Sequence, residues 1–397
     1  MKSTIFEPAR EIPVAGHFDV IVAGGGFAGI SAALSAKRAG AENVLLLERE
    51  YTLGGLATLG LVTIYLPLCD GTGRQVSFGI AEELLKLSIS HGAEEEQLPD
   101  CWVRAASREE RAKHRYRCQY NPAVFASLVD QLLLSEGVTL LFGTTVCAAA
   151  MEDGHIRALI TENKNGRQAY TADSFIDATG DADICRMTDE ATVDFKQGNV
   201  MAAWSYAAKE NILSLRMLGF SDKPDSEKPG GKTPEDDTRE RFTGREAAEL
   251  TRLMVLSRKW AVDDFLREGD LMPGHSIVTL PTIPQIRMTR RIKGETEMSL
   301  SMDGQFVSDS VGLISNWKRV GPVYEVPFGS LCAKISNLYA AGRCMAAEED
   351  MWDVTRVIPC CAVTGEAAGV AAAVGRDLEK VQAVLRERKI PLHITDL

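Results

Sequence analysis

Residues 18–40 read FDVIVAGGGFAGISAALSAKRAG, and two patterns meet within them. The segment begins with a short apolar run that ends in glycines, which is typical of a buried strand followed by a tight turn. It continues as small and apolar residues that close at Gly40, which is typical of a helix. A second apolar run, NVLLLERE, follows at residues 43–50. Strand, helix and strand in this order predict one βαβ unit with parallel strands.

The glycines between the first strand and the helix have the spacing G-x-G-x-x-G, at Gly24, Gly26 and Gly29. Gly24 permits the tight turn, Gly26 lets the backbone approach a pyrophosphate, and Gly29 lets the helix pack closely on the strand. The N-terminus of the helix would then present unpaired N–H groups to the phosphates. Glu48 closes the second strand 19 residues after Gly29, where a carboxylate can accept hydrogen bonds from an adenosine ribose.

The order of these elements predicts a dinucleotide-binding domain, whereas a glycine-rich turn by itself would be weak evidence. The acid at Glu48 disfavours a 2′-phosphate, and with it NADP. Three later motifs bear on the choice of dinucleotide: LGGLAT at residues 53–58, IDATGDAD at residues 176–183 and LYAAGRC at residues 338–344. A nicotinamide dehydrogenase has no evident need for such a distributed set.

The chain has 397 residues, which favours two or three domains, or one large domain with an insertion. The net charge of −11 argues against nucleic acid or an anionic membrane as the main partner. No apolar run reaches the ~18 residues of a membrane span, and the N-terminal residues lack the apolar core of a signal peptide. A cytoplasmic protein without a membrane span is therefore expected.

Further elements surround the first unit. PAVFASLVDQLLLSEG, from residue 122, predicts a helix with proline at its start and glycine just past its end. Residues 138–181 alternate short strands with turn signals, which predicts a small antiparallel meander followed by the buried strand SFIDATG. NLYAAG, from residue 337, predicts another buried strand near the end of the chain.

The character of the chain changes in its middle. Residues 220–241 are rich in proline, glycine and charge, which is typical of a surface loop or of a lid. The two ends of the chain look like one α/β domain, so the predicted division is residues 1–186 with 331–397, and an inserted α+β domain at residues 187–330.

Taken together, the motifs VIVAGGGFAGISAA, LGGLAT, DATGD, PQIRMTRRIKGE and TRVIPCCAVTGEAAGVAAA resemble the FAD-dependent oxidoreductase family. This family belongs to the wider glutathione-reductase-like flavoproteins, and the resemblance runs over residues 19–374. It implies a Rossmann FAD-binding domain with a small antiparallel meander, FAD as cofactor, and an inserted substrate or cap domain. Because there is only one G-x-G-x-x-G, no separate domain for a pyridine nucleotide is expected.

The resemblance also implies roles for single residues. The first glycine motif would hold the pyrophosphate, Glu48 the adenosine ribose, and a helix starting near Ala362 would direct its N-terminus at the flavin ring. The residues expected to contact FAD are Gly24, Gly26, Phe27, Ala28, Gly29, Glu48, Arg49, Gly54, Gly55, Thr58, Val146, Thr179, Gly180, Asp181, Gly342, Arg343, Gly365 and Ala367.

Arginines are the first candidates for substrate binding. PQIRMTRRIKGE brings Arg287, Arg290 and Arg291 close together in an otherwise acidic chain. On a strand, Arg287 and Arg291 would share one face and Arg290 the other, and one face could clamp a carboxylate bidentately. The alternative is interdomain salt bridges; for substrate binding, Arg290 or Arg291 is favoured. Arg356 could contact the flavin or the substrate, or only the nearby acids.

Cysteines are the second group of candidates. The chain has nine, an odd number without CxxC spacing, so a disulfide framework and a metal site are not expected. Cys360 and Cys361 are neighbours, which disfavours a disulfide between them. A single reactive thiol at Cys360, a covalent flavin link and small packing side chains beside the flavin remain as alternatives. The residues that follow Cys361 are small and recur at helical spacing, so one face of the expected helix carries almost no side chains.

The sequence therefore predicts an FAD-dependent oxidoreductase that exchanges a hydride between the flavin and a small polar or anionic organic substrate under the cap domain. Its electron donor or acceptor is left open, and so is a homo-oligomer. Two other classes stay open: an electron-transfer subunit that relays electrons between protein partners, and a non-redox FAD-binding module.

Overall fold

The computed structural model of the protein describes residues 4–91, 98–219 and 240–397. Its largest sheet contains parallel strands in the order β5-β2-β1-β8, and β16 pairs in parallel with the C-terminal end of β8. Their bounds are β5 Val138–Leu141, β2 Val44–Leu47, β1 Val14–Ala23, β8 Gly166–Asp177 and β16 Leu338–Ala340. The predicted βαβ unit is confirmed, because α1, Phe27–Arg38, connects the parallel strands β1 and β2.

The C-terminal half of β1 is buried on both faces. Val20 and Val22 belong to the core that the helices cover, while Ile21 and Ala23 belong to a second core under the other face. Successive side chains of a strand point to opposite faces, so a continuous apolar run is what a parallel strand covered on both sides requires.

The predicted meander is present as β6, Thr145–Glu152, β7, His155–Asn163, and the first half of β8. The sequence suggested a separate buried strand after the meander, but both are parts of one strand. No glycine or proline interrupts residues 167–177. The strand therefore pairs antiparallel with β7 in its first half and continues in parallel between β1 and β16.

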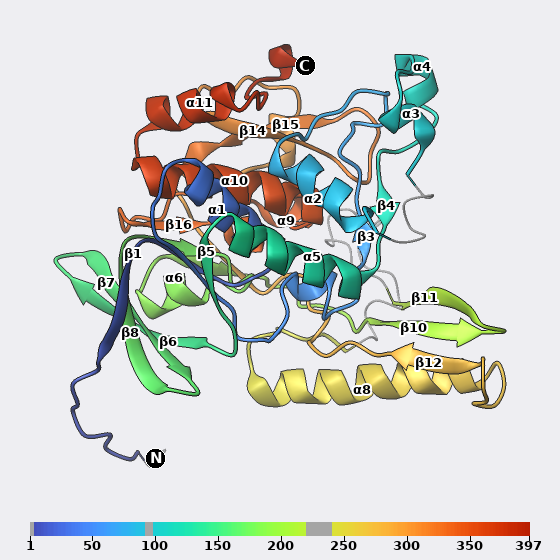
Figure 1. The fold of residues 1–397 in the computed structure, drawn as a ribbon, viewed down its shortest axis with the longest axis horizontal. Helices are drawn as coiled ribbons and strands as arrows, with labels where there is room; N and C mark the ends of the chain where they lie inside the picture. The colour runs from blue at the N-terminus through green and yellow to red at the C-terminus, as the bar shows by residue number, and fades with distance from the viewer. Residues whose placement is uncertain (1–3, 92–97, 220–239) are drawn as a thin grey trace.

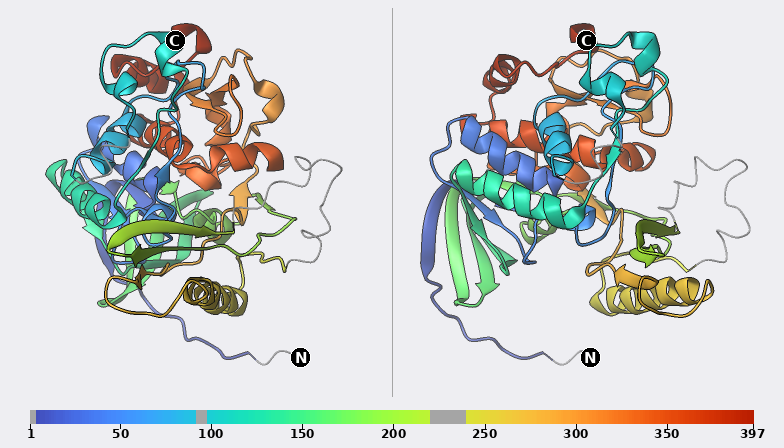
Figure 2. Two further views of the ribbon diagram at one scale, coloured as in Figure 1. Left: turned by 90° about the vertical axis from the view of Figure 1, so that its right-hand side faces the viewer. Right: turned by 45° about the vertical axis from the view of Figure 1, so that its right-hand side comes forward.

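Helices form a layer over one side of the sheet (Figures 1 and 2). α1 packs closely against α10, Ile358–Val374, although more than 300 residues of sequence separate the two helices. α2, Ile80–Ser88, and α5, Pro122–Ser135, belong to the same layer. α5 begins with Pro122 in its first turn, as predicted, and the side chain of Asn121 caps it.

A second, smaller unit lies away from the helical layer, beneath it in Figure 1. It is an antiparallel sheet in the order β11-β10-β12 with one long helix packed on β10. The bounds are β10 Ala203–Lys209, β11 Ile212–Leu218, β12 Ser276–Thr279 and α8 Ala247–Leu266. The possible lid at residues 220–241 lies almost wholly outside the described residues.

Two strands of the predicted inserted domain pack elsewhere. β14, Ser310–Ser315, and β15, Val323–Pro327, form a hairpin, and β14 contacts α10 and α11, Leu378–Glu387. The predicted domain boundaries at residues 187 and 330 stay a prediction. The remaining short strands and α-helices of the described residues are β3 Ile64–Tyr65, α3 Asp100–Val103, α4 Arg108–Arg111, β4 Cys118–Gln119, α6 Asp183–Met187, β9 Thr192–Asp194, β13 Arg290–Ile292 and α9 Glu349–Thr355.

Within the described part of the chain, no single helix has both the length and the apolar character needed to cross a membrane. The bent pair α9 and α10 meets these requirements together, by length and composition alone.

Candidate cofactor site

The three glycines in the turn between β1 and α1 differ in the space that surrounds them. Gly24 has φ +101°, and a Cβ there would collide with the carbonyl oxygen of Ala178 at the end of β8. A Cβ on Gly29 would collide with the carbonyl oxygen of Gly24. A Cβ on Gly26 would meet no atom within 4 Å. Gly24 and Gly29 thus permit close packing, and Gly26 leaves open space at the start of α1.

The N-terminus of α1 has no compensating group of its own. Its N-cap residue is Gly26, which has no side chain, and the first turn holds no acidic residue. The first N–H groups of a helix lack intrahelical partners and carry the positive end of the helix dipole. An uncapped helix start beside open space is therefore suited to a phosphate group.

Glu48 lies directly beside this turn. Its carboxylate accepts hydrogen bonds from the N–H groups of Gly25 at 2.6 Å and Glu50 at 2.8 Å. Burial raises the pKa of Glu48, although these two hydrogen bonds act in the opposite direction. A carboxylate has about four acceptor positions, so further ones remain for a ribose.

The glycine pair Gly54 and Gly55 lies beside the first glycine motif. The N–H of Gly54 donates to the carbonyl of Gly25 at 2.8 Å, and Gly26 and Gly54 form an isolated parallel bridge. Thr58 fixes the turn by donating its hydroxyl hydrogen to the Leu53 carbonyl at 2.6 Å. The motif LGGLAT therefore lies against the first glycine motif.

The end of β8 supplies the third part of the site. Arg343 donates from Nε to the carbonyl of Gly180 at 3.1 Å and pairs with Asp181 at 3.3 Å. Thr179 donates its hydroxyl hydrogen to Asp177 at 2.7 Å, and Gly24 packs against this turn. DATGD and LYAAGRC, far apart in sequence, thus meet beside the first glycine motif.

Helix α10 approaches α1 at backbone distance. A Cβ on Gly365 or Gly369 would collide with a carbonyl oxygen of α1, that of Ala28 or Ala32. Two hydrogen bonds cross the contact: the Ser31 hydroxyl donates to the Ala362 carbonyl at 2.6 Å, and the Ser35 hydroxyl donates to the Glu366 carbonyl at 2.7 Å. The predicted bare face of the helix is therefore present and faces α1.

The start of α10 differs from the prediction. The helix begins at Ile358, four residues before Ala362, with Pro359 in its first turn. No side chain caps it, and its first turn has no acidic residue. The start of α10 is thus a second uncompensated positive helix end, suited to an electron-rich group.

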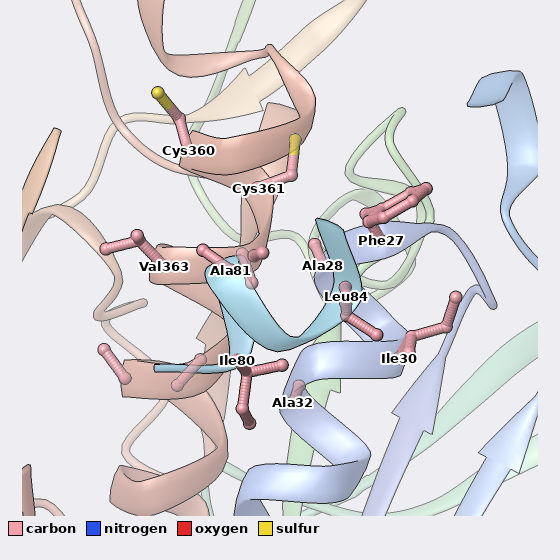
Figure 3. Close-up of a cluster of buried hydrophobic side chains, with 14 of the residues drawn as sticks. Phe27, Ala28, Ile30, Ala32, Ile80, Ala81, Leu84, Cys360, Cys361 and Val363 are labelled. Carbon is pink, nitrogen blue, oxygen red and sulfur yellow. The ribbon is translucent and has the colours of Figure 1, made fainter. Parts of the chain in front are cut away.

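The two neighbouring cysteines lie in this first turn, and their side chains point in different directions (Figure 3). Both are free thiols, and Cys361 is the one near Gly342 and Ala28. Burial raises the pKa of Cys361 to about 11 and the pKa of Cys360 well above its ordinary value. Protonated, buried thiols favour the packing role over the reactive thiol considered at Cys360.

The favoured arginines are already paired. Arg290 binds Asp183 at 2.9 Å and the Asp181 carbonyl at 3.1 Å. Arg291 lies 3.5 Å from Glu297, with its guanidinium over the ring of Trp352. These contacts match the ion-pair alternative, and a substrate role for either arginine stays a prediction.

The strand expected over the three arginines is shorter than predicted. β13 contains only Arg290–Ile292. The N–H groups of Arg287 and Met288 instead donate to the side-chain oxygen of Asn199, at 3.2 and 3.1 Å. A side chain thus takes the donors that a neighbouring strand would have used, and Arg287 lies outside the strand.

Arg356 lies between two kinds of neighbour. It forms an ion pair with the buried Asp353, which Lys318 also binds. Despite burial, Arg356 and Lys318 lower the pKa of Asp353. The carbonyl of Arg356 accepts a hydrogen bond from the Cys361 thiol at 3.3 Å, so this cation lies beside the start of α10.

Three expected FAD residues lie outside the glycine turns. Arg49 is exposed and lies 3.8 Å from Glu50, Val146 lies in β6, and Ala367 is buried in α10. Sequence reasoning missed Ser31 and Ser35. Their spacing of four on a helix of small residues is the signal that could have marked them.

The residues around the turn fit FAD on three counts: the open space at Gly26, the adjacent carboxylate of Glu48 and the two uncapped helix starts. Fold and site together define a flavoprotein of the Rossmann type. The sequence model described as "FAD dependent oxidoreductase" matches residues 19–203 and 199–389, and the chain belongs to this family. FAD is accordingly its cofactor, which confirms the prediction from sequence.

Solved structures give distant likenesses. A geranylgeranyl bacteriochlorophyll reductase-like protein of Thermoplasma acidophilum is 13% identical, with 96% of this chain and 86% of that chain covered at a TM-score of 0.46. Mycobacterium smegmatis Sdh1 is 12% identical, with 94% and 72% covered at 0.44. The anhydrotetracycline hydroxylase OxyS of Streptomyces rimosus is 11% identical, with 93% and 63% covered at 0.43. Likenesses this distant decide nothing about the reaction. No curated protein matches the chain.

Proposed function

We propose that the protein exchanges a hydride between FAD and a small polar or anionic organic substrate, held under the segment of residues 187–330. FAD supplies the hydride chemistry when it is bound. The observation that carries the proposal is the close packing of α1 on α10, two helices whose starts at Gly26 and Ile358 are both uncapped, in a member of the FAD dependent oxidoreductase family. A cytoplasmic location stays a prediction.

The protein's own residues would bind FAD and orient it. The start of α1 with Gly26 would hold the pyrophosphate, and Glu48 would fix the adenosine ribose. The start of α10 would face the flavin ring, where its positive end stabilises negative charge. Tight packing of α1 on α10 through Gly365 and Gly369 fixes both helix starts relative to each other.

An anaerobic titration followed through the visible absorbance of bound FAD tests the reaction. We expect a small polar or anionic organic compound to bleach the flavin directly. Bleaching only by a reduced protein partner would instead indicate an electron relay, and bleaching by neither would indicate a non-redox FAD module. Protein that binds no FAD at all would contradict the whole proposal.

Gly26→Ala tests the cofactor site itself. Gly26 has φ −72° and ψ 178°, which alanine adopts freely, and there is room for the methyl group in the absence of FAD. We expect unchanged thermal stability without FAD and an affinity for FAD that falls by ~10-fold or more, because the methyl group occupies the pyrophosphate approach. Equilibrium dialysis with FAD measures the affinity.

Gly29→Ala is the matched control in the same turn. Its methyl group would collide with the Gly24 carbonyl, so this variant should be destabilised even without FAD. A Gly26→Ala protein that binds FAD as tightly as the parent would contradict the assignment of the pyrophosphate to this turn.

A further inference from the structure

Arg287 is a buried cation that has no carboxylate partner in the part of the chain that the structure describes. The residue is only 5% exposed, yet its guanidinium donates just one hydrogen bond, from Nη1 to the Gln285 carbonyl at 3.3 Å. The guanidinium carbon lies 5.3 Å from the centre of the Trp204 ring. Among the described residues no carboxylate forms an ion pair with it, and its Nε and Nη2 keep contact with solvent.

The other two buried arginines of the described chain show what is missing. Arg290 has Asp183 as its partner, and Arg291 has Glu297. Arg291 also lies over a tryptophan ring, so it repeats the arrangement of Arg287 with a carboxylate added. A buried charge is normally paired, because an unpaired one loses its hydration without compensation.

The surroundings of Arg287 are positive. Burial, and after it the charges of Arg356 and Arg343, lower the pKa of Arg287 to about 9, so the side chain still carries its charge at neutral pH. Asp353 acts in the opposite direction, but this carboxylate already binds Arg356. Arg343 donates a hydrogen bond to the carbonyl of Ile286, the residue before Arg287, at 3.0 Å, and Arg356 lies beside the start of α10, where its carbonyl accepts from the Cys361 thiol at 3.3 Å.

We propose that Arg287 binds a carboxylate group of the substrate, so that the reaction proposed above acts on an organic acid. The inference rests on that proposed function. The planar guanidinium can donate two parallel hydrogen bonds to a carboxylate, and it lies over the Trp204 ring. The positive charges of Arg343 and Arg356 favour the approach of an anion. The two nearby carboxylates, Asp181 and Asp353, are already paired with Arg343 and Arg356 and so do not pair with Arg287.

The experiment uses FAD-loaded protein and a set of simple probes: acetate, succinate and citrate, each beside its uncharged amide. Two quantities are measured, the difference spectrum of the bound flavin and the unfolding temperature. We expect at least one carboxylate to change both quantities and the matching amide to change neither. Arg287→Met should weaken this response by ~10-fold or more, because a bidentate, charge-assisted contact is lost.

The stability of Arg287→Met without ligand separates binding from a structural role. Removing a lone buried charge should leave the unfolding temperature unchanged or raise it. Arg216→Met is the matched control, because Arg216 also lies over an aromatic ring, that of Phe265, but is paired with Asp264 and Glu268. This control should unfold at a lower temperature and keep the carboxylate response.

Three results would overturn the inference. The parent protein with FAD bound could respond to none of the carboxylates, Arg287→Met could keep the response, or Arg287→Met could be destabilised as Arg216→Met is. Protein that fails to bind FAD would contradict the proposed function instead. In that case the unfolding temperature with and without the carboxylates still decides whether Arg287 binds them.

Discussion

Glu366 is a carboxylate inside the helical layer, in the middle of α10. It accepts a hydrogen bond from the Ile80 N–H at 2.9 Å and lies 3.6 Å from Arg388. Burial raises the pKa of Glu366, and burial also lowers the pKa of Arg388, so each group is held more weakly charged than in water. The pair therefore links α10 to α2 and to the C-terminal segment without fully offsetting the loss of hydration.

This arrangement predicts a pH dependence of stability. Because the folded protein holds the Glu366 proton more tightly than the unfolded chain does, its free energy of unfolding should fall as the pH rises above the ordinary value of 4.5. Glu366→Gln removes this contribution, so its stability should fall less over the same range. Urea unfolding between ~pH 4 and ~pH 8 measures this difference.

Glu379→Gln is the control for that measurement, because Glu379 is exposed on α11. Its stability should follow the parent at every pH. Equal pH slopes for Glu366→Gln and the parent would show that the buried carboxylate does not titrate differently in the folded state.

The role of a single residue was predictable from the sequence where that role depends on backbone geometry. The packing of Gly24 and Gly29 and the open space at Gly26 follow from local geometry and were expected from spacing alone. The arginines were not predictable in this way. Whether Arg287 or Arg291 has a partner depends on where Glu297 and the other acids lie, and on Asn199 holding the backbone of Arg287, contacts that sequence spacing does not encode.

At the scale of elements, the contact of α1 with α10 dominates. Small residues at spacings of three and four predicted this contact correctly, since the spacing alone places them on one face. The start of α10 was misplaced by four residues. Pro359 was the available signal, because proline is favoured in the first turn of a helix and Cys360 and Cys361 are then helical.

Gly369→Ala tests the close contact. In an open helix interior this change stabilises by ~1 kcal/mol, because alanine is the better helix former. Here the methyl group would collide with the Ala32 carbonyl and contact the Ser35 side chain. We expect a net loss of ~1–3 kcal/mol in the free energy of unfolding, measured in urea.

Ala373→Gly, near the end of the same helix, is the control and should cost only the difference in helix propensity, ~1 kcal/mol. A Gly369→Ala protein as stable as the parent would mean that α10 can move away from α1 at little cost.

At the scale of the molecule, the α/β class, the meander and the cofactor were predictable, because each depends on a pattern within a short segment. The hairpin β14–β15 was not. Its apolar strands indicate burial, but nothing in their pattern says that they cover α10 and α11 rather than the sheet of β10, β11 and β12.

FAD should stabilise the whole fold, because the proposed site joins the first strand and helix to an element near the end of the chain. Binding to the folded state alone adds ~2.7 kcal/mol at a hundredfold excess over Kd. The midpoint of urea unfolding should therefore rise with FAD concentration, and the rise should be reduced in Gly26→Ala. A midpoint that is independent of FAD would contradict the site.

The hydrogen bonds from Ser31 to Ala362 and from Ser35 to Glu366 each span 331 residues. During synthesis, the first βαβ unit leaves the ribosome long before its partner helix exists. The small-residue face of α1 therefore stays exposed until α10 has been synthesised. During this time the nascent chain can aggregate or bind a chaperone. In the proposed site, FAD binding must then follow the synthesis of α10, and a chain that ends before Ile358 would lack one of the two helix starts of that site.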